Sequence, residues 1–130
     1  LLDRFDIQVE VAPVEYEHLS SGAKEESSEA IRERVQAARE IQQKRFAGTD
    51  ITCNAMITPD ILHDVCPMSD EASVMLKNVF EKMGLSARAY DRILKVARTV
   101  ADMEGEEVIG KSHIARAVQF RSLDRKYWSE

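Results

Sequence analysis

Two arginines lie where a helix is expected to begin, and their positions could bring positive charge to a phosphate group. The stretch after Ser86 predicts a helix, with Arg88 in its first turn and Arg92 one turn further on the same polar face. A cation at this end of a helix opposes the helix dipole by about 0.3–1 kcal/mol. The placement is sensible if a polyanion docks there, because N–H groups at a helix start attract phosphate. The alternative is an ordinary solvated face, on which Asp91 or another acid offsets the charge.

A third arginine, Arg4, lies between the pair Leu1-Leu2 and Phe5. Apolar neighbours that anchor the chain at the end of a strand could aim the Arg4 guanidinium across an interface between molecules. Equally, Arg4 could be a surface cation paired with a neighbouring aspartate, Asp3 or Asp6. Spacing alone leaves both interpretations open.

The segment Gly105–Ser112 matches the phosphate-loop pattern G-x-x-x-x-G-K-[ST] letter for letter. A phosphate loop needs a strand before it and a helix after it, so that backbone N–H groups wrap around an anion. Here a helix is predicted before the segment, and Glu106 and Glu107 would place two negative charges beside the phosphates. We therefore expect a turn between two helices, which begins at Gly105.

Two cysteines, Cys53 and Cys66, are too few for a disulfide scaffold. We expect unlinked thiols that pack as small apolar side chains. A disulfide between them and a zinc site that includes His63 are the alternatives, but the paired ligand spacing of zinc sites is missing, so no metal is expected. The three histidines are scattered and form no nucleophile–base grouping, so the sequence predicts no hydrolase triad.

Composition indicates one soluble globular domain. The chain has 130 residues, 44% hydrophobic and 32% charged, and 18 basic against 23 acidic residues give a formal net charge of −5. This balance argues against a free-standing basic nucleic-acid module, although one basic face could still touch phosphate. No apolar run approaches the length of a membrane span, and the first residues contain no secretory signal. We therefore expect a cytoplasmic protein.

Apolar spacing and capping residues predict about five helices joined by short loops. They are expected from Ser27 or Ser28 to about Phe46, from Thr58 to before Pro67, from Ser69 to Gly84, from Ser86 to about Gly105, and from Ser112 to Ser122. The residues expected to face the core are Ile31, Val35, Ala38, Ile41, Ala72, Met75, Leu76, Val79, Phe80, Met83, Tyr90, Ile93, Leu94, Ala97, Val100, Ala101, Ile114, Ala117 and Val118.

Residues 6–12 alternate polar and apolar side chains and predict one strand, which Pro13 ends. A single strand has no partner for its backbone donors and acceptors. We therefore expect this chain to be a piece of a larger protein, and the absence of a starting methionine agrees with that expectation. The predicted fold is mainly α, a small helical bundle preceded by one orphan strand.

Four blocks of sequence resemble the C-terminal part of bacterial Mg-chelatase-like AAA+ ATPases of the YifB/ComM type. They are residues 1–7 (Leu-Leu-Asp-Arg-Phe-Asp-Ile), 27–35 (Ser-Ser-Glu-Ala-Ile-Arg-Glu-Arg-Val), 85–102 (Leu-Ser-Ala-Arg-Ala-Tyr-Asp-Arg-Ile-Leu-Lys-Val-Ala-Arg-Thr-Val-Ala-Asp) and 120–125 (Phe-Arg-Ser-Leu-Asp-Arg). The blocks occur in family order. The resemblance implies that residues 1–15 are the last strand of an α/β nucleotide-binding core, 16–27 a connector, and 28–130 the helical lid over the nucleotide.

The resemblance also implies roles for the arginines. Arg4 matches the arginine finger, which reaches the nucleotide of a neighbouring subunit, and Arg88 matches the second sensor, which touches the γ-phosphate. Arg92 has no family role, and a secondary phosphate contact is what its position suggests. By this resemblance, the full-length protein would use ATP and Mg²⁺, form a hexameric ring of identical subunits, and act on DNA during recombination. This chain lacks the Walker A and Walker B segments, so no ATPase activity is expected from it alone.

A different class of function stays open on the residues themselves. The chain could be a free-standing helical interaction module, in which the basic residues of the Ser28–Phe46 helix contact DNA or another protein.

Overall fold

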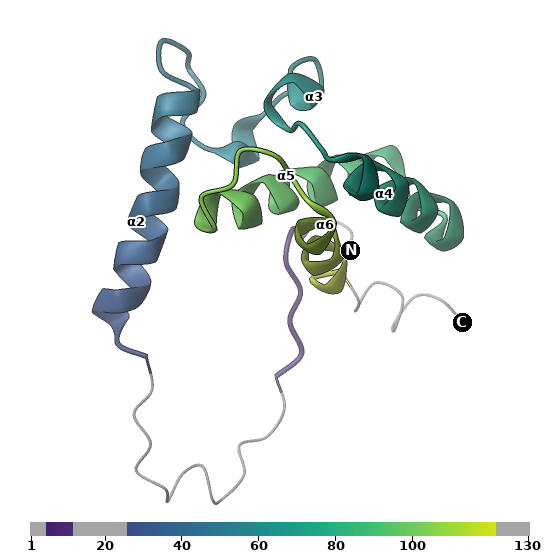
Figure 1. Cartoon of the computed structure of the whole chain (residues 1–130), viewed down its shortest axis with the longest axis horizontal. Coiled ribbons are helices and arrows are strands. Elements are labelled where there is room, and N and C mark those ends of the chain that lie inside the picture. The colour runs from purple at the N-terminus through teal and green to yellow at the C-terminus, as the bar shows by residue number, and fades with distance from the viewer. Residues whose placement is uncertain (1–4, 12–25, 122–130) are drawn as a thin grey trace, which may run out of the picture.

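The protein is a bundle of helices, as Figure 1 shows. The computed structural model describes residues 5–11 and 26–121. In these ranges lie the α-helices α2 (Ser28–Arg45), α3 (Leu62–Val65), α4 (Asp70–Met83), α5 (Ala87–Met103) and α6 (Lys111–Gln119), and the 3₁₀ helix η2 (Asn54–Met56). The prediction of a mainly helical bundle is confirmed. The connector predicted over 16–27 and the tail beyond Arg121 lie largely outside the described residues.

Three of the long helices begin at serines that cap them. The side chains of Ser27, Ser69 and Ser86 each accept a hydrogen bond of 3.1 Å from the backbone N–H three residues on. Such a bond satisfies one of the four N–H groups that a helix start leaves without an intrahelical acceptor. Helix α4 ends at Gly84, whose φ of +59° is accessible to a residue without a side chain. The predicted starts of α2, α4 and α5 are therefore confirmed.

Helix α5 is the central element of the core. It packs against α6 and α2, and α6 also packs against α4 (Figure 1). The α5 stripe of Ile93, Leu94, Ala97 and Ala101 is buried, as its spacing predicts. The rest of the core comes from α5 itself, from α3, α4 and α6, and from residues next to helix ends or in loops: Phe46, Ile57, Leu62, Cys66, Ala72, Leu76, Val96, Ile109, Ile114 and Ala117.

Two apolar stripes are only partly buried. On α2, Ala38 is buried, whereas Ile31 and Val35 are exposed because only the C-terminal half of this helix reaches the bundle. On α4, Ala72 and Leu76 are buried, but Phe80 remains 38% exposed. The expectation that Ile31, Val35 and Phe80 face the core of this chain is therefore wrong.

Two predicted helices have different bounds in the structure. The helix expected from Thr58 begins only at Leu62, because Thr58 and Pro59 belong to a turn closed by a hydrogen bond of 3.2 Å from Ile61 N–H to the Thr58 carbonyl. The last helix begins at Lys111, one residue before the expected Ser112, and ends at Gln119.

The predicted strand is present only as a segment without regular secondary structure. Residues 5–11, which we name the N-terminal arm, form no ladder with any other described residue. Ile7, Val9 and Val11 are exposed. A strand needs a row of backbone partners for its N–H and C=O groups, and the described residues form no such row beside the arm. The one β-type pairing among them is an isolated parallel bridge between Met68 and Ile109.

Candidate functional site

Arg88 lies in the first turn of α5, two residues after the capping Ser86. Its side chain is exposed, and among residues 5–11 and 26–121 it forms no hydrogen bond or ion pair. The guanidinium is therefore positioned beside the positive end of the helix dipole with no acid of the described chain to balance it. This arrangement can receive an anion, because the helix start and the guanidinium attract negative charge together.

Arg92, one turn further along α5, has a different environment. Its side chain is 22% exposed, and Nε lies 3.6 Å from a carboxylate oxygen of Asp6 in the N-terminal arm. Arg92 thus holds the arm against α5. A role of Arg92 as a secondary phosphate contact stays a prediction.

Arg4 lies outside the described residues, but the residues that follow it are placed. Phe5 and Gln8 of the arm meet the end of α6: the Phe5 carbonyl accepts a hydrogen bond of 2.8 Å from Arg121 Nη1, and the Gln8 N–H donates one of 2.6 Å to the Phe120 carbonyl. The segment adjoining Arg4 therefore contacts both α6 and, through Asp6, the helix that carries Arg88.

A buried ionic cluster joins the other end of α5 to α2 and η2. We name it the Asp102 cluster, and its members are Arg45, Asn54, Arg98 and Asp102. Asp102, 2% exposed, accepts from both terminal nitrogens of Arg45 at 2.9 and 2.6 Å, from Asn54 Nδ2 at 2.8 Å and from Arg98 Nε at 3.1 Å. Burial lowers the pKa of the Arg98 guanidinium, and the Asp102 carboxylate opposes that change.

The Asp102 cluster also holds the conformation of residues 105–112, which match the phosphate-loop pattern. Arg98 donates to the carbonyls of Glu106 and Glu107, at 2.6 and 2.7 Å. The N–H of Ile109 is bonded to the Pro67 carbonyl at 2.8 Å. A phosphate cradle would turn N–H groups toward an anion, whereas this loop turns carbonyls toward a cation. The expected turn between two helices is confirmed.

The cysteines and the two histidines that the structure describes, His63 and His113, form no cluster that could hold a metal ion. Cys53 and Cys66 are both free thiols. Burial raises the pKa of the Cys66 thiol to about 11, so it is neutral at pH 7. Within the described ranges, no three His, Cys, Asp or Glu side chains gather in a way that could hold a metal ion.

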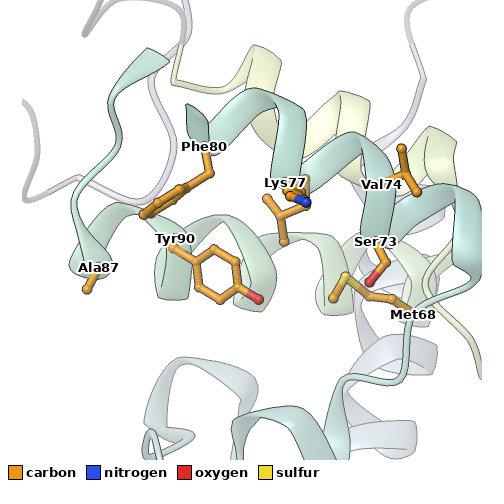
Figure 2. Close-up of a pocket in the computed structure, with 8 residues that line it drawn as sticks. Met68, Ser73, Val74, Lys77, Phe80, Ala87 and Tyr90 are labelled. Atoms are coloured by element: carbon orange, nitrogen blue, oxygen red, sulfur yellow. The ribbon is translucent and has the colours of Figure 1, made fainter. Parts of the chain in front are cut away.

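A groove of about 570 Å³ lies between α4 and α5, and sequence reasoning missed it. Figure 2 shows Phe80 and Tyr90 projecting into it from the two helices. Their rings meet edge to face with centroids 6.0 Å apart, while Met68 and Val74 line the groove further along. The lining is mostly apolar, with Ser73 and Lys77 of α4 as its polar residues. An exposed apolar surface of this kind is suited to packing against another group. The sequence could have indicated the groove, because the apolar residues of α4, such as Leu76, Phe80 and Val74, cover more of the helix surface than one buried face needs.

No helix in the described ranges is both long and apolar enough to span a membrane.

Residues 25–121 match the family described as magnesium chelatase, subunit ChlI C-terminal. The helical bundle and this match together show that the chain belongs to the magnesium chelatase C-terminal family.

Particular relatives are similar over nearly the whole chain. It is 40% identical over 125 residues to competence protein ComM of Haemophilus influenzae and 37% identical over 125 residues to uncharacterized protein YifB of Escherichia coli, in both cases over 95% of this chain. An uncharacterized protein of Mycobacterium tuberculosis is 32% identical over 121 residues, or 93% of this chain. In each case the chain spans 24% of the relative's length.

Proposed function

We propose that this chain is the lid and sensor region of an AAA+ ATPase of the Mg-chelatase type, which couples ATP binding and hydrolysis to movement between subunits. Arg88 is the second sensor, which contacts nucleotide phosphate, and Arg4 is the arginine finger toward a neighbouring subunit's nucleotide. The observation that carries the proposal is the exposed Arg88 guanidinium in the first turn of α5, which has no ion-pair partner among the described residues. The family to which the chain belongs supports it.

Both roles require a guanidinium. Its planar fork and permanent charge complement the oxygens of a phosphate better than a lysine ammonium does. Arg88 adds its charge to the positive field of the α5 start, so a phosphate at this place would be held by the side chain and the helix dipole together. Arg4 would stabilise charge that builds up on the transferred phosphoryl group, an effect worth about 10³–10⁵ in rate in well-studied systems.

Mg²⁺ and ATP would be bound mainly by a nucleotide-binding core outside residues 1–130. The fit of this chain to the nucleotide rests on Arg88, because the described residues hold no cluster of metal-binding side chains and their phosphate-loop match is a turn around Arg98. When bound, ATP supplies the phosphoryl group. The chain alone is expected neither to bind ATP tightly nor to hydrolyse it.

The proposal extends to the assembly. One relative is named a competence protein. We propose a cytoplasmic, ring-forming motor, hexameric in its full-length form, that acts on DNA during recombination. In such a ring Arg4 of one subunit would face the nucleotide of the next identical subunit.

The test compares ATP hydrolysis by the full-length protein that contains this chain with Arg4→Ala and Arg88→Ala variants. Each variant should lose about 10³-fold or more in kcat, the lower range of arginine-finger effects. Arg116→Ala is the matched control, because Arg116 is an exposed arginine on α6. Rates near wild type in both site variants would overturn the proposal.

A second candidate function is an interaction module that uses α2. The N-terminal half of this helix extends away from the bundle, and Ile31 and Val35 are exposed there between charged residues (Figure 1). An exposed apolar pair on a charged helix is suited to a partner protein. Loss of a partner in Val35→Glu, together with unchanged ATP hydrolysis in the Arg4 and Arg88 variants, would favour this function.

A further inference from the structure

The N-terminal arm is attached to the bundle by a buried arginine. Arg121 is 2% exposed, and its Nη1 donates a hydrogen bond of 2.8 Å to the Phe5 carbonyl. A hydrogen bond from a charged group is about twice as strong as one between neutral groups, and shielding from water strengthens it further. The charged Arg121 side chain is therefore bonded to the backbone of Phe5, the residue that follows Arg4.

The attachment continues along the arm. The Gln8 N–H donates to the Phe120 carbonyl at 2.6 Å, and Gln8 is 7% exposed, whereas Ile7 and Val9 on either side are more than half exposed. The arm is thus held at specific polar points rather than by burial of its apolar side chains. Polar contacts of this kind fix the register of a segment, because a shift by one residue breaks all of them.

The third attachment point is on α5. Arg92 Nε lies 3.6 Å from the Asp6 carboxylate, and Arg92 is one turn from Arg88 on the same helix. The contacts of the arm therefore lie close in sequence to both arginines of the proposed function. Arg4, the proposed arginine finger, directly precedes Phe5, and Arg88, the proposed second sensor, is four positions before Arg92.

We infer that Arg121, assisted by the Asp6–Arg92 ion pair, is a positioning residue for Arg4, which ties the arginine finger to the sensor helix so that the two move together. This inference rests on the proposed function, because it assigns Arg121 an effect that passes through Arg4. A change of lid position would then be transmitted to the nucleotide of the neighbouring subunit through the arm.

The test is a double-mutant cycle of ATP hydrolysis in the full-length protein. Arg121→Met removes the donor to Phe5 and keeps an apolar stem in its place. It should lower kcat by about 10- to 100-fold, the cost of misplacing a catalytic group by about 1 Å. In an Arg4→Ala background the same substitution should lower kcat no further, since residues acting through one another are not additive. Arg121→Lys, which retains a donor, should restore part of the rate.

Arg116→Met, on α6 five residues before Arg121, is the control and should leave kcat unchanged in both backgrounds. Equal loss from Arg121→Met in both backgrounds, or no loss, overturns the inference while Arg4→Ala alone still reports on the proposed function. A wild-type rate in Arg4→Ala instead overturns the finger itself. If Arg121→Met does not fold, Asp6→Asn, at an exposed position, is used in the same cycle with the same criteria.

A readout that does not depend on activity is hydrogen exchange at the Gln8 amide. Arg121→Met should accelerate exchange there by about tenfold, because release of the arm exposes this N–H to water. Exchange within α5 should stay as in wild type. Unchanged exchange at Gln8 would show that Arg121 does not hold the arm and would overturn the inference.

Discussion

Asp102 and Arg45 are 57 residues apart in the sequence, and their side chains form a two-point ion pair with N–O distances of 2.9 and 2.6 Å. The same carboxylate also binds Asn54 and Arg98. One side chain therefore joins α2, η2 and α5, and through Arg98 it also holds the loop before α6.

Loss of this carboxylate should destabilise the chain strongly. Asp102→Ala leaves two arginines, one of them 1% exposed, without their counter-charge. We expect a decrease of about 3–5 kcal/mol in the free energy of unfolding, as for other broken buried ion pairs. Urea denaturation followed by circular dichroism measures it, with Asp50→Ala, at an exposed position, as control. A decrease below about 1 kcal/mol would contradict the central role given to Asp102.

Stability should fall in alkaline solution because of Cys66. Burial raises the pKa of this thiol from 9.0 to about 11, so the folded state keeps a proton that the unfolded state releases. The stabilisation is fully present below pH 9 and is lost as the pH rises toward 11, by up to about 2–3 kcal/mol. Urea denaturation at several pH values measures this slope. Cys66→Ala should be less stable than wild type at neutral pH but should show a shallower slope above pH 9, and an identical slope would rule out Cys66 as the cause.

The two thiols should differ in reactivity. Cys53 is partly exposed, whereas Cys66 is buried and neutral. With iodoacetamide at pH 8, we expect rapid labelling of Cys53 and protection of Cys66 until the chain unfolds, because the thiolate is the reacting species. Peptide mass spectrometry at successive times separates the two sites. Equal labelling rates under native conditions would contradict the burial of Cys66.

The phosphate-loop match should be without consequence for nucleotide binding. Lys111→Ala changes the lysine of the pattern but leaves the carbonyl contacts of Arg98 in place. We expect ATP hydrolysis by the full-length protein to stay within about twofold of wild type, as for other exposed substitutions away from a site. A loss comparable to that of a true phosphate-loop lysine variant would show that the loop does bind phosphate.

Removal of one serine cap should have a modest effect. Ser69 Oγ accepts from the Ala72 N–H at 3.1 Å, and Ser69→Ala should decrease the free energy of unfolding by about 1 kcal/mol. Ser112→Ala, at an exposed position in the first turn of α6, is the control. Equal effects of the two substitutions would mean that the cap of α4 contributes nothing specific.

Local signals in the sequence predicted most of the fold. Ser27, Ser69 and Ser86 predicted three helix starts, because a capping serine acts within three residues of its own position. The α5 stripe was predicted equally well, since a long helix buried along one side has a clear period. The start of α3 was missed, because Thr58 and Pro59 are as suitable for a turn as for a helix.

Contacts between distant residues could not be predicted in this way. The spacing of Arg98 and Asp102 suggests an ion pair on a helix, but their burial depends on Arg45 and Asn54, which come from other elements. The contact of Arg121 with Phe5 joins positions 116 residues apart and has no local signature. For the candidate site, the exposure of Arg88 agrees with its predicted position, whereas the contact of Arg92 with Asp6 became visible only in the structure.

The Asp102 cluster anchors the C-terminal end of α5 to α2 and η2, so a rigid rotation of this helix would have its pivot at Asp102. Arg88 is 14 positions before Asp102, or about 21 Å along the helix at 1.5 Å per residue. A rotation of about 5° around the pivot would displace the tip that carries Arg88 by nearly 2 Å, close to the difference between a hydrogen bond and no contact at all. Small angular changes at the anchored end are thus amplified where the guanidinium is exposed.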